Sequence, residues 1–105
     1  MEEILQKCKE ILRRHYKNRF LGLVLYGSMV QQNRLPSAND SDIDLLVLLS
    51  PPIDYLQELH TIVDLLYPVQ LESSRLISAK PAPFDAYEKG SLALYRNARQ
   101  EGVRI

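Results

Sequence analysis

Apolar residues recur along this chain with two different periods, and the changes of period mark the expected elements. Over residues 2–17 they recur every three or four positions, which predicts an amphipathic helix. Phe20–Tyr26 is rich in branched and aromatic residues and stops at Gly27, which predicts a buried strand. Ile43–Leu49 is continuously apolar, which is typical of a central strand covered on both faces. The polar segment between the two strands, residues 29–41, is expected to be mostly loop.

The second half of the chain predicts three more helices and one more strand. After the break at "SPPID", Asp54 is the expected N-cap of a helix, and Gln57 completes a capping box. Helical spacing predicts a buried stripe on that helix: Leu56, Leu59, Ile62, Val63 and Leu66. Residues 68–78 are expected to form a third strand. Two short helices, each followed by a glycine, are expected to close the chain: 84–89 with Gly90, and 91–101 with Gly102.

This order of elements predicts a mixed α/β (α+β) domain, in which helices cover a small mixed β-sheet. With 105 residues, we expect one domain over 1–105. A hydrophobic fraction of 46% and a charged fraction of 25% are typical of a soluble globular protein. Thirteen basic residues balance thirteen acidic ones. The chain therefore has no net charge that would attract it to nucleic acid or to a membrane surface.

Cysteine content and hydropathy indicate a cytoplasmic protein. The single cysteine, Cys8, excludes an internal disulfide, and its place on the apolar side of the first helix favours the core. No apolar run approaches the roughly 20 residues that a membrane-spanning helix needs. The start "MEEILQKCKE" is acidic and helical, unlike a signal or transit peptide.

Two aspartates, Asp42 and Asp44, open the second strand. Side chains two apart on a strand point to the same face, so we expect the two carboxylates to lie side by side. Like charges placed together resist burial, which points to a cation that neutralises them. Mg²⁺ is usually bound by one or two carboxylates together with substrate phosphates, and it suits such a pair. Asp42 and Asp44 are therefore the candidate metal ligands.

A glycine and a serine, Gly27 and Ser28, follow the first strand. Glycine has no Cβ, so a phosphate can approach its backbone closely. Ser28 adds a hydroxyl and a backbone N–H as donors. Donors on one side and a metal on the other describe a site for a nucleoside triphosphate. The alternative is a purely structural role, in which the aspartates cap a strand and solvate a loop and Gly27 makes a turn.

Three other motifs fail on spacing. An EF-hand beginning at Asp40 would need glycine at Leu45 and glutamate at Pro51. A serine-hydrolase elbow around Ser28 would need glycine at Tyr26 and at Val30. A Walker-type phosphate loop would need Gly-Lys-Ser/Thr, which the sequence lacks.

The pattern of Gly27-Ser28, a spacer, and Asp42-Ile43-Asp44 followed by "LLVLL" resembles the signature of the DNA polymerase beta-like nucleotidyltransferases. The short chain resembles the minimal nucleotidyltransferases (MNT) that are paired with HEPN-domain toxins in prokaryotic toxin–antitoxin modules. This resemblance implies a nucleotidyltransferase fold, with Asp42 and Asp44 binding magnesium and Gly27 and Ser28 holding the phosphates of ATP. It also implies transfer of AMP from ATP to a tyrosine of the partner toxin, which silences the toxin.

Three features depart from that family. The spacer from Ser28 to Asp42 holds thirteen residues, longer than is usual, and Met29 stands where arginine is common. The family's third carboxylate normally lies on the strand after the long helix, and alignment of "PVQLE" puts Gln70 there. An amide cannot act as a base. Glu72, expected two residues later and on the same strand face, is the candidate to replace that carboxylate. The alternative is that Glu72 is only a solvated acid at the end of the strand.

The sequence thus favours a magnesium-dependent nucleotidyltransferase with Asp42, Asp44 and Glu72 as catalytic candidates and ATP as the nucleotide. The alternative is an antitoxin that neutralises its partner by contact, with little or no catalysis. Transfer to an antibiotic is a third option, which the lack of a C-terminal domain disfavours. Another chain, either a second copy or the toxin, is expected to complete the open acceptor side. No contact with nucleic acid is expected.

Overall fold

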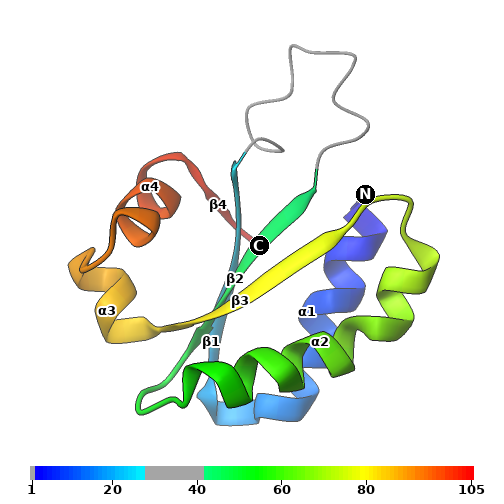
Figure 1. The fold of residues 1–105 in the computed structure, drawn as a ribbon, viewed down its shortest axis with the longest axis horizontal. Coiled ribbons are helices and arrows are strands. Elements are labelled where there is room, and N and C mark those ends of the chain that lie inside the picture. The colour runs from blue at the N-terminus through cyan, green and yellow to red at the C-terminus, as the bar shows by residue number, and fades with distance from the viewer. Residues whose placement is uncertain (1, 28–41) are drawn as a thin grey trace.

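The computed structural model describes residues 2–27 and 42–105 (Figure 1). Its helices and strands follow in the order α1 (Glu2–Tyr16), the short 3-10 helix η1 (Lys17–Arg19), β1 (Phe20–Tyr26), β2 (Ile43–Leu49), α2 (Tyr55–Glu72), β3 (Ile77–Pro83), α3 (Phe84–Lys89), α4 (Ala93–Glu101) and β4 (Val103–Arg104). The mixed α+β class expected from the sequence is confirmed.

The four strands form one mixed sheet in the order β3-β2-β1-β4. β1 runs antiparallel to both β2 and β4, whereas β2 and β3 are parallel. A parallel pair needs a long crossover, and α2 supplies it. Because β1 and β2 are antiparallel neighbours, the end of β1 and the start of β2 meet at one edge of the sheet.

Helices cover both faces of the sheet (Figure 1). On one face, α1 and α2 pack against β2 residues such as Ile43, Leu45 and Val47. On the other face, α3 and α4 pack against Leu46 and Leu48. The continuous apolar run of β2 is therefore buried on both sides, as its sequence predicts.

The predicted N-cap of α2 is confirmed, since the Gln57 backbone N–H donates to Asp54 Oδ1 at 3.3 Å. The third strand was expected too early in the chain. α2 continues to Glu72, and β3 begins only at Ile77. The helix continues because Val69 follows Ile62 and Leu66 at helical spacing and is buried with them.

The expected buried stripe of α2 is only partly correct. Ile62 and Leu66 are buried and Leu59 is half-buried, but the side chains of Leu56 and Val63 are 68% and 56% exposed. These two residues lie on a different side of the helix from the buried ones.

The short strand β4 has no counterpart in the sequence prediction, because two residues carry no readable period. It is held to β1 by the Ile105 N–H, which donates to the Leu23 carbonyl at 2.9 Å, and by the Arg104 guanidinium, which donates to the Leu21 carbonyl at 2.6 Å. The closing helices agree with prediction, and Gly90 ends α3 in the left-handed conformation. Among the described residues, no helix is long and apolar enough to cross a bilayer.

Candidate functional site

Gly27 and Asp44 meet at the edge where β1 ends and β2 begins. Tyr26 pairs with Asp44 in the antiparallel register, so the next residue, Gly27, lies beside the same carboxylate. Gly27 has a φ of +77°, and a Cβ built on it would lie 2.5 Å from Asp44 Oδ2. The positive φ favours glycine here, and a Cβ would also displace the Asp44 carboxylate.

The carboxylate of Asp44 lies in an unfavourable electrostatic setting. Burial raises its pKa above the ordinary value, the negative charge of Asp42 raises it further, and the charge of Lys80 opposes both. Asp42 stands directly before β2 and is exposed. Two neighbouring acids, of which one is half-buried, are stabilised by a bound cation because the cation removes their repulsion.

The other half of the predicted phosphate site lies outside the described residues. Ser28 and Met29 belong to the segment 28–41, as do Arg34 and the thirteen-residue spacer. The structure therefore describes Gly27, Asp42 and Asp44 among the sequence-predicted residues of this edge.

The third strand presents Ser78 and Lys80 to the Asp44 side of the sheet. Parallel pairing puts Ser78 beside Asp44 and Lys80 beside Leu46. Residues paired in register share a face, and Leu46 packs with Ala82 in the core under α3 and α4. The strand, "ISAKPAP", contains no carboxylate. On the strand after the long helix, where the resembled family carries its third acid, this chain offers a hydroxyl and an ammonium group.

Gln70 and Glu72 are not on a strand, which corrects the alignment made from the sequence. Both belong to α2. Gln70 stabilises the turn after this helix: its Nε2 donates to the Arg75 carbonyl at 3.0 Å, and its Oε1 accepts from the Ile77 N–H at 2.7 Å. The amide at position 70 therefore has a structural explanation.

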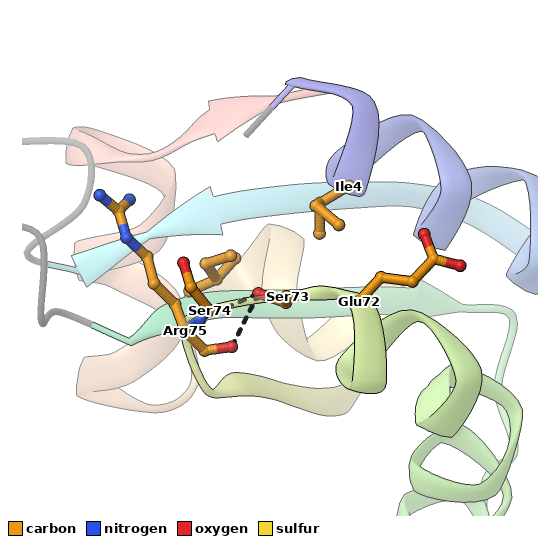
Figure 2. Close-up of a pocket in the computed structure, with 6 residues that line it drawn as sticks. Ile4, Glu72, Ser73, Ser74 and Arg75 are labelled. Carbon is orange, nitrogen blue, oxygen red and sulfur yellow. Dashed lines mark hydrogen bonds between the residues drawn. The ribbon is translucent and has the colours of Figure 1, made fainter.

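Glu72 ends α2 and forms an exposed ion pair with Lys7 of α1. It also lines an open cleft of about 240 Å³, together with Ile4, Ile43, Ser73, Ser74 and Arg75. Figure 2 shows the Glu72 carboxylate and the Arg75 side chain pointing in opposite directions. Ile43 faces α1 and α2, whereas Asp44, the next residue on the strand, points to the opposite face. Glu72 therefore lies on the α1–α2 side of the sheet, away from the Asp44 carboxylate.

Comparison with known proteins identifies the fold. No family model matches the chain. Spectinomycin 9-adenylyltransferase of Enterococcus faecalis is 41% identical over 51 residues, which are 49% of this chain and 19% of that protein. A crystal structure of spectinomycin adenyltransferase AAD(9) from E. faecalis, with ATP and spectinomycin, aligns with 100% of this chain and 55% of its own, at 21% identity and a TM-score of 0.66. The chain has the nucleotidyltransferase fold. It spans about half the length of that solved relative.

Within this nucleotidyltransferase fold, the described residues suit a magnesium ion that takes its remaining ligands from water and from substrate phosphates. Asp42 and Asp44 supply two oxygen-bearing side chains, and no group of three or more His, Cys, Asp or Glu side chains gathers in residues 2–27 and 42–105. Mg²⁺ commonly takes one or two carboxylates, with waters and substrate phosphates filling its other positions. A preformed cage of protein ligands is not needed for this type of site.

The structure also adds residues that the sequence did not single out. One is Lys80, whose charge opposes the rise in the pKa of the Asp44 carboxyl. Ser78 was placed at the end of the predicted strand without a role. Both depend on the parallel register between β2 and β3, and that register is not readable from the sequence. The two histidines, His15 and His60, are exposed, and Cys8 is buried, as its place on the apolar side of the first helix predicts.

Proposed function

We propose that this domain binds ATP and Mg²⁺ between the Gly27-Ser28 turn and the Asp42/Asp44 pair, and transfers AMP to a hydroxyl group. The observation that carries this proposal is the close approach of the Asp44 carboxylate to Gly27. A Cβ built on Gly27 would lie 2.5 Å from Asp44 Oδ2. This approach leaves backbone and carboxylate next to each other, where a phosphate and its metal would both be held. The fold and the similarity to an adenylyltransferase over 51 residues support the same activity.

In the proposed reaction, the acceptor oxygen bonds to the α-phosphorus of ATP. The bond from that phosphorus to the oxygen bridging to the β-phosphate breaks, pyrophosphate leaves with the electron pair, and the hydroxyl proton passes to water. Mg²⁺, when bound, neutralises the phosphate oxygens. Asp42 and Asp44 hold the ion, and Gly27 lets the phosphates approach the backbone. Lys80, on the same face, is placed to attract the phosphate charge.

The acceptor we propose is a tyrosine hydroxyl of a HEPN toxin partner, with this chain as the antitoxin. The resemblance to the minimal nucleotidyltransferases supports this acceptor. The two similar proteins are named as spectinomycin adenylyltransferases. A small compound with a hydroxyl group is therefore the second acceptor to include in any assay. Both acceptors present a hydroxyl to the same phosphorus, and they differ only in what surrounds it.

A second candidate function is nucleotide binding without transfer, with neutralisation of the partner by contact. Its support is the composition of β3, which offers Ser78 and Lys80 where a third carboxylate would activate the acceptor. A serine hydroxyl is not ionised near neutral pH and is a poor base, and a protonated lysine cannot accept a proton. This candidate predicts ATP binding that still depends on Asp44, but no labelled product.

Incubation with ATP labelled at the α-phosphate, Mg²⁺ and the partner toxin tests the proposal, and spectinomycin serves as the acceptor in a parallel reaction. We expect label on the toxin with the wild type and none with Asp44→Asn. Asp64→Asn is the matched control, because it makes the same change at an exposed site on α2. Equal labelling by Asp44→Asn rejects the site. Binding of ATP without label on either acceptor selects the second candidate.

A further inference from the structure

α2 has two apolar sides, of which the fold covers only one. Its inner side buries Ile62, Leu66 and Val69 against the sheet and α1. A second row of side chains is exposed, and we name it the outer stripe: Leu56, His60, Val63, Tyr67 and Leu71. Its four apolar members are between 56% and 68% exposed. Single exposed apolar residues are ordinary, but a row along one helix marks an interaction surface.

The outer stripe has the spacing of a helix-packing seam. Its members are separated by four, three, four and four positions, so they follow one side of the helix. From Leu56 to Leu71 the row extends about 22 Å at the usual rise of an α-helix. The length is sufficient for another helix to pack along it over four turns.

The order of residues in the stripe is self-complementary. If two copies of α2 pack antiparallel about a two-fold axis between positions 63 and 64, Leu56 lies opposite Leu71 of the second copy. The same axis places His60 opposite Tyr67, and it brings the two Val63 side chains together at the centre. A two-fold interface uses one surface patch twice, and this symmetry is its requirement.

The surface of the stripe contains a hollow that faces a projecting side chain in this arrangement. Leu59, His60, Val63 and Asp64 line an open depression of about 220 Å³. Tyr67 of the second copy would lie opposite His60 and so enter this depression. A side chain that inserts between four residues of a facing helix is the usual packing unit of paired helices.

Charge on α2 also permits self-association. The helix has no lysine or arginine and three acidic residues. Two of these are engaged with the α1–η1 side: Glu58 accepts from Tyr16 and Arg19, and Glu72 pairs with Lys7. The third, Asp64, lies beside the stripe. In the antiparallel pair, the axis brings the two Asp64 side chains near each other on one flank, and His60 of each copy falls within one helical turn of the other copy's Asp64.

We propose that the outer stripe is the contact surface of a homodimer, formed by antiparallel packing of α2 against α2 of a second copy. The four apolar side chains offer about 400 Å² per copy, or about 800 Å² per pair, which is below the roughly 1,600 Å² of a standard interface. A contact of this size is typical of a weak, transient dimer. This proposal does not rest on the proposed catalytic function.

Sedimentation velocity from low to high micromolar concentration tests the dimer. We expect the wild type to shift reversibly from monomer toward dimer. Val63→Glu, which places two like charges at the axis, should weaken association by about tenfold or more. Gln57→Glu is the matched control, since it adds the same charge at an exposed position of α2 outside the stripe. Circular dichroism establishes that each variant is folded.

Disulfide formation gives a second, geometric test. Val63→Cys should crosslink two copies under mild oxidation, because the two positions meet at the axis, whereas Gln57→Cys should not. The native Cys8 does not interfere, since it is buried and burial raises the pKa of its thiol to about 11. A wild type that stays monomeric at every concentration overturns the proposal. Equal association of Val63→Glu, or equal crosslinking at position 57, also overturns it.

Discussion

Asp44 and Glu58 are both partly buried carboxylates, and their surroundings differ in kind. Glu58 accepts a hydrogen bond from the Tyr16 hydroxyl at 2.9 Å and from the Arg19 guanidinium at 3.3 Å, and that guanidinium also lies over the Tyr16 ring. Within residues 2–27 and 42–105, no hydrogen bond or ion pair holds the Asp44 carboxylate. The negative charge of Asp42 raises the pKa of Asp44 further.

This difference separates an acid that supports the fold from one available for a ligand. Glu58 joins α2 to the end of α1, and its charge is compensated by the protein itself. Asp44 is compensated only in part, by the charge of Lys80, and burial makes its charged form costly. A carboxylate left in that state is a candidate functional group, because a bound cation supplies the missing partner.

The largest expected effect comes from Asp44→Asn. Mg²⁺-dependent ATP binding should weaken by about 100-fold or more, because losing a direct metal ligand costs more than losing the outer groups that support one. Equilibrium binding of labelled ATP with and without Mg²⁺ measures this loss. Glu58→Gln should bind ATP like the wild type; if it loses affinity to the same degree, the contrast between the two acids is wrong.

The reverse contrast is expected in stability. Glu58→Gln should lower the free energy of unfolding by about 1–2 kcal/mol, because it removes a charge that accepts two bonds at a largely buried position. Urea denaturation followed by circular dichroism measures the change. An unfolding curve identical to that of the wild type would show that Glu58 contributes no more than a surface charge.

A carboxylate restored on β3 should increase transfer. Ser78→Asp places an acid beside Asp44 in the parallel register, so we expect a gain of about tenfold in labelled product, below the roughly 100-fold or more that a well-positioned base contributes. Ser78→Asn has nearly the same shape without the charge and should give no gain. If both variants give the same amount of product, the missing third acid does not limit the reaction.

The smallest expected effect is on the pH dependence of stability without Mg²⁺. The pKa of Asp44 is raised in the folded state, so the folded chain binds more protons than the unfolded chain in the pH range between the ordinary value, about 4, and the raised one. Stability contributed by this group therefore falls as pH rises through the raised value. Relative to the wild type, Asp44→Asn should be more stable at neutral pH and show no gain at acid pH. Urea melts at the two pH values test this difference.

The sequence predicted the elements that have a strong period and missed those defined by pairing. The continuous run Ile43–Leu49 predicted a doubly covered strand, and Asp54 predicted the start of α2. The end of α2 was placed too early because Pro68 suggests a break, although the buried Val69 continues the helix. Leu56 and Val63 share the helical spacing of the core, and apolar spacing alone cannot distinguish the core from a second interface.

In the candidate site, too, local features could be predicted from the sequence and features that depend on strand pairing could not. Gly27, Asp42 and Asp44 were found because short motifs at strand ends are local features of the sequence. Glu72 was misplaced and Ser78 was overlooked because the third position depends on how β3 pairs with β2. That register is set by the length of the crossover helix and by packing, and neither can be counted along the chain.

Isothermal titration calorimetry of the wild-type chain with ATP, in the presence and absence of Mg²⁺, tests the central claim most directly. We predict saturable binding that requires Mg²⁺ and is lost in Asp44→Asn but kept in Asp64→Asn. Absence of any binding by the folded wild type, or equal binding by Asp44→Asn, would contradict the assignment of this sheet edge as a nucleotide site.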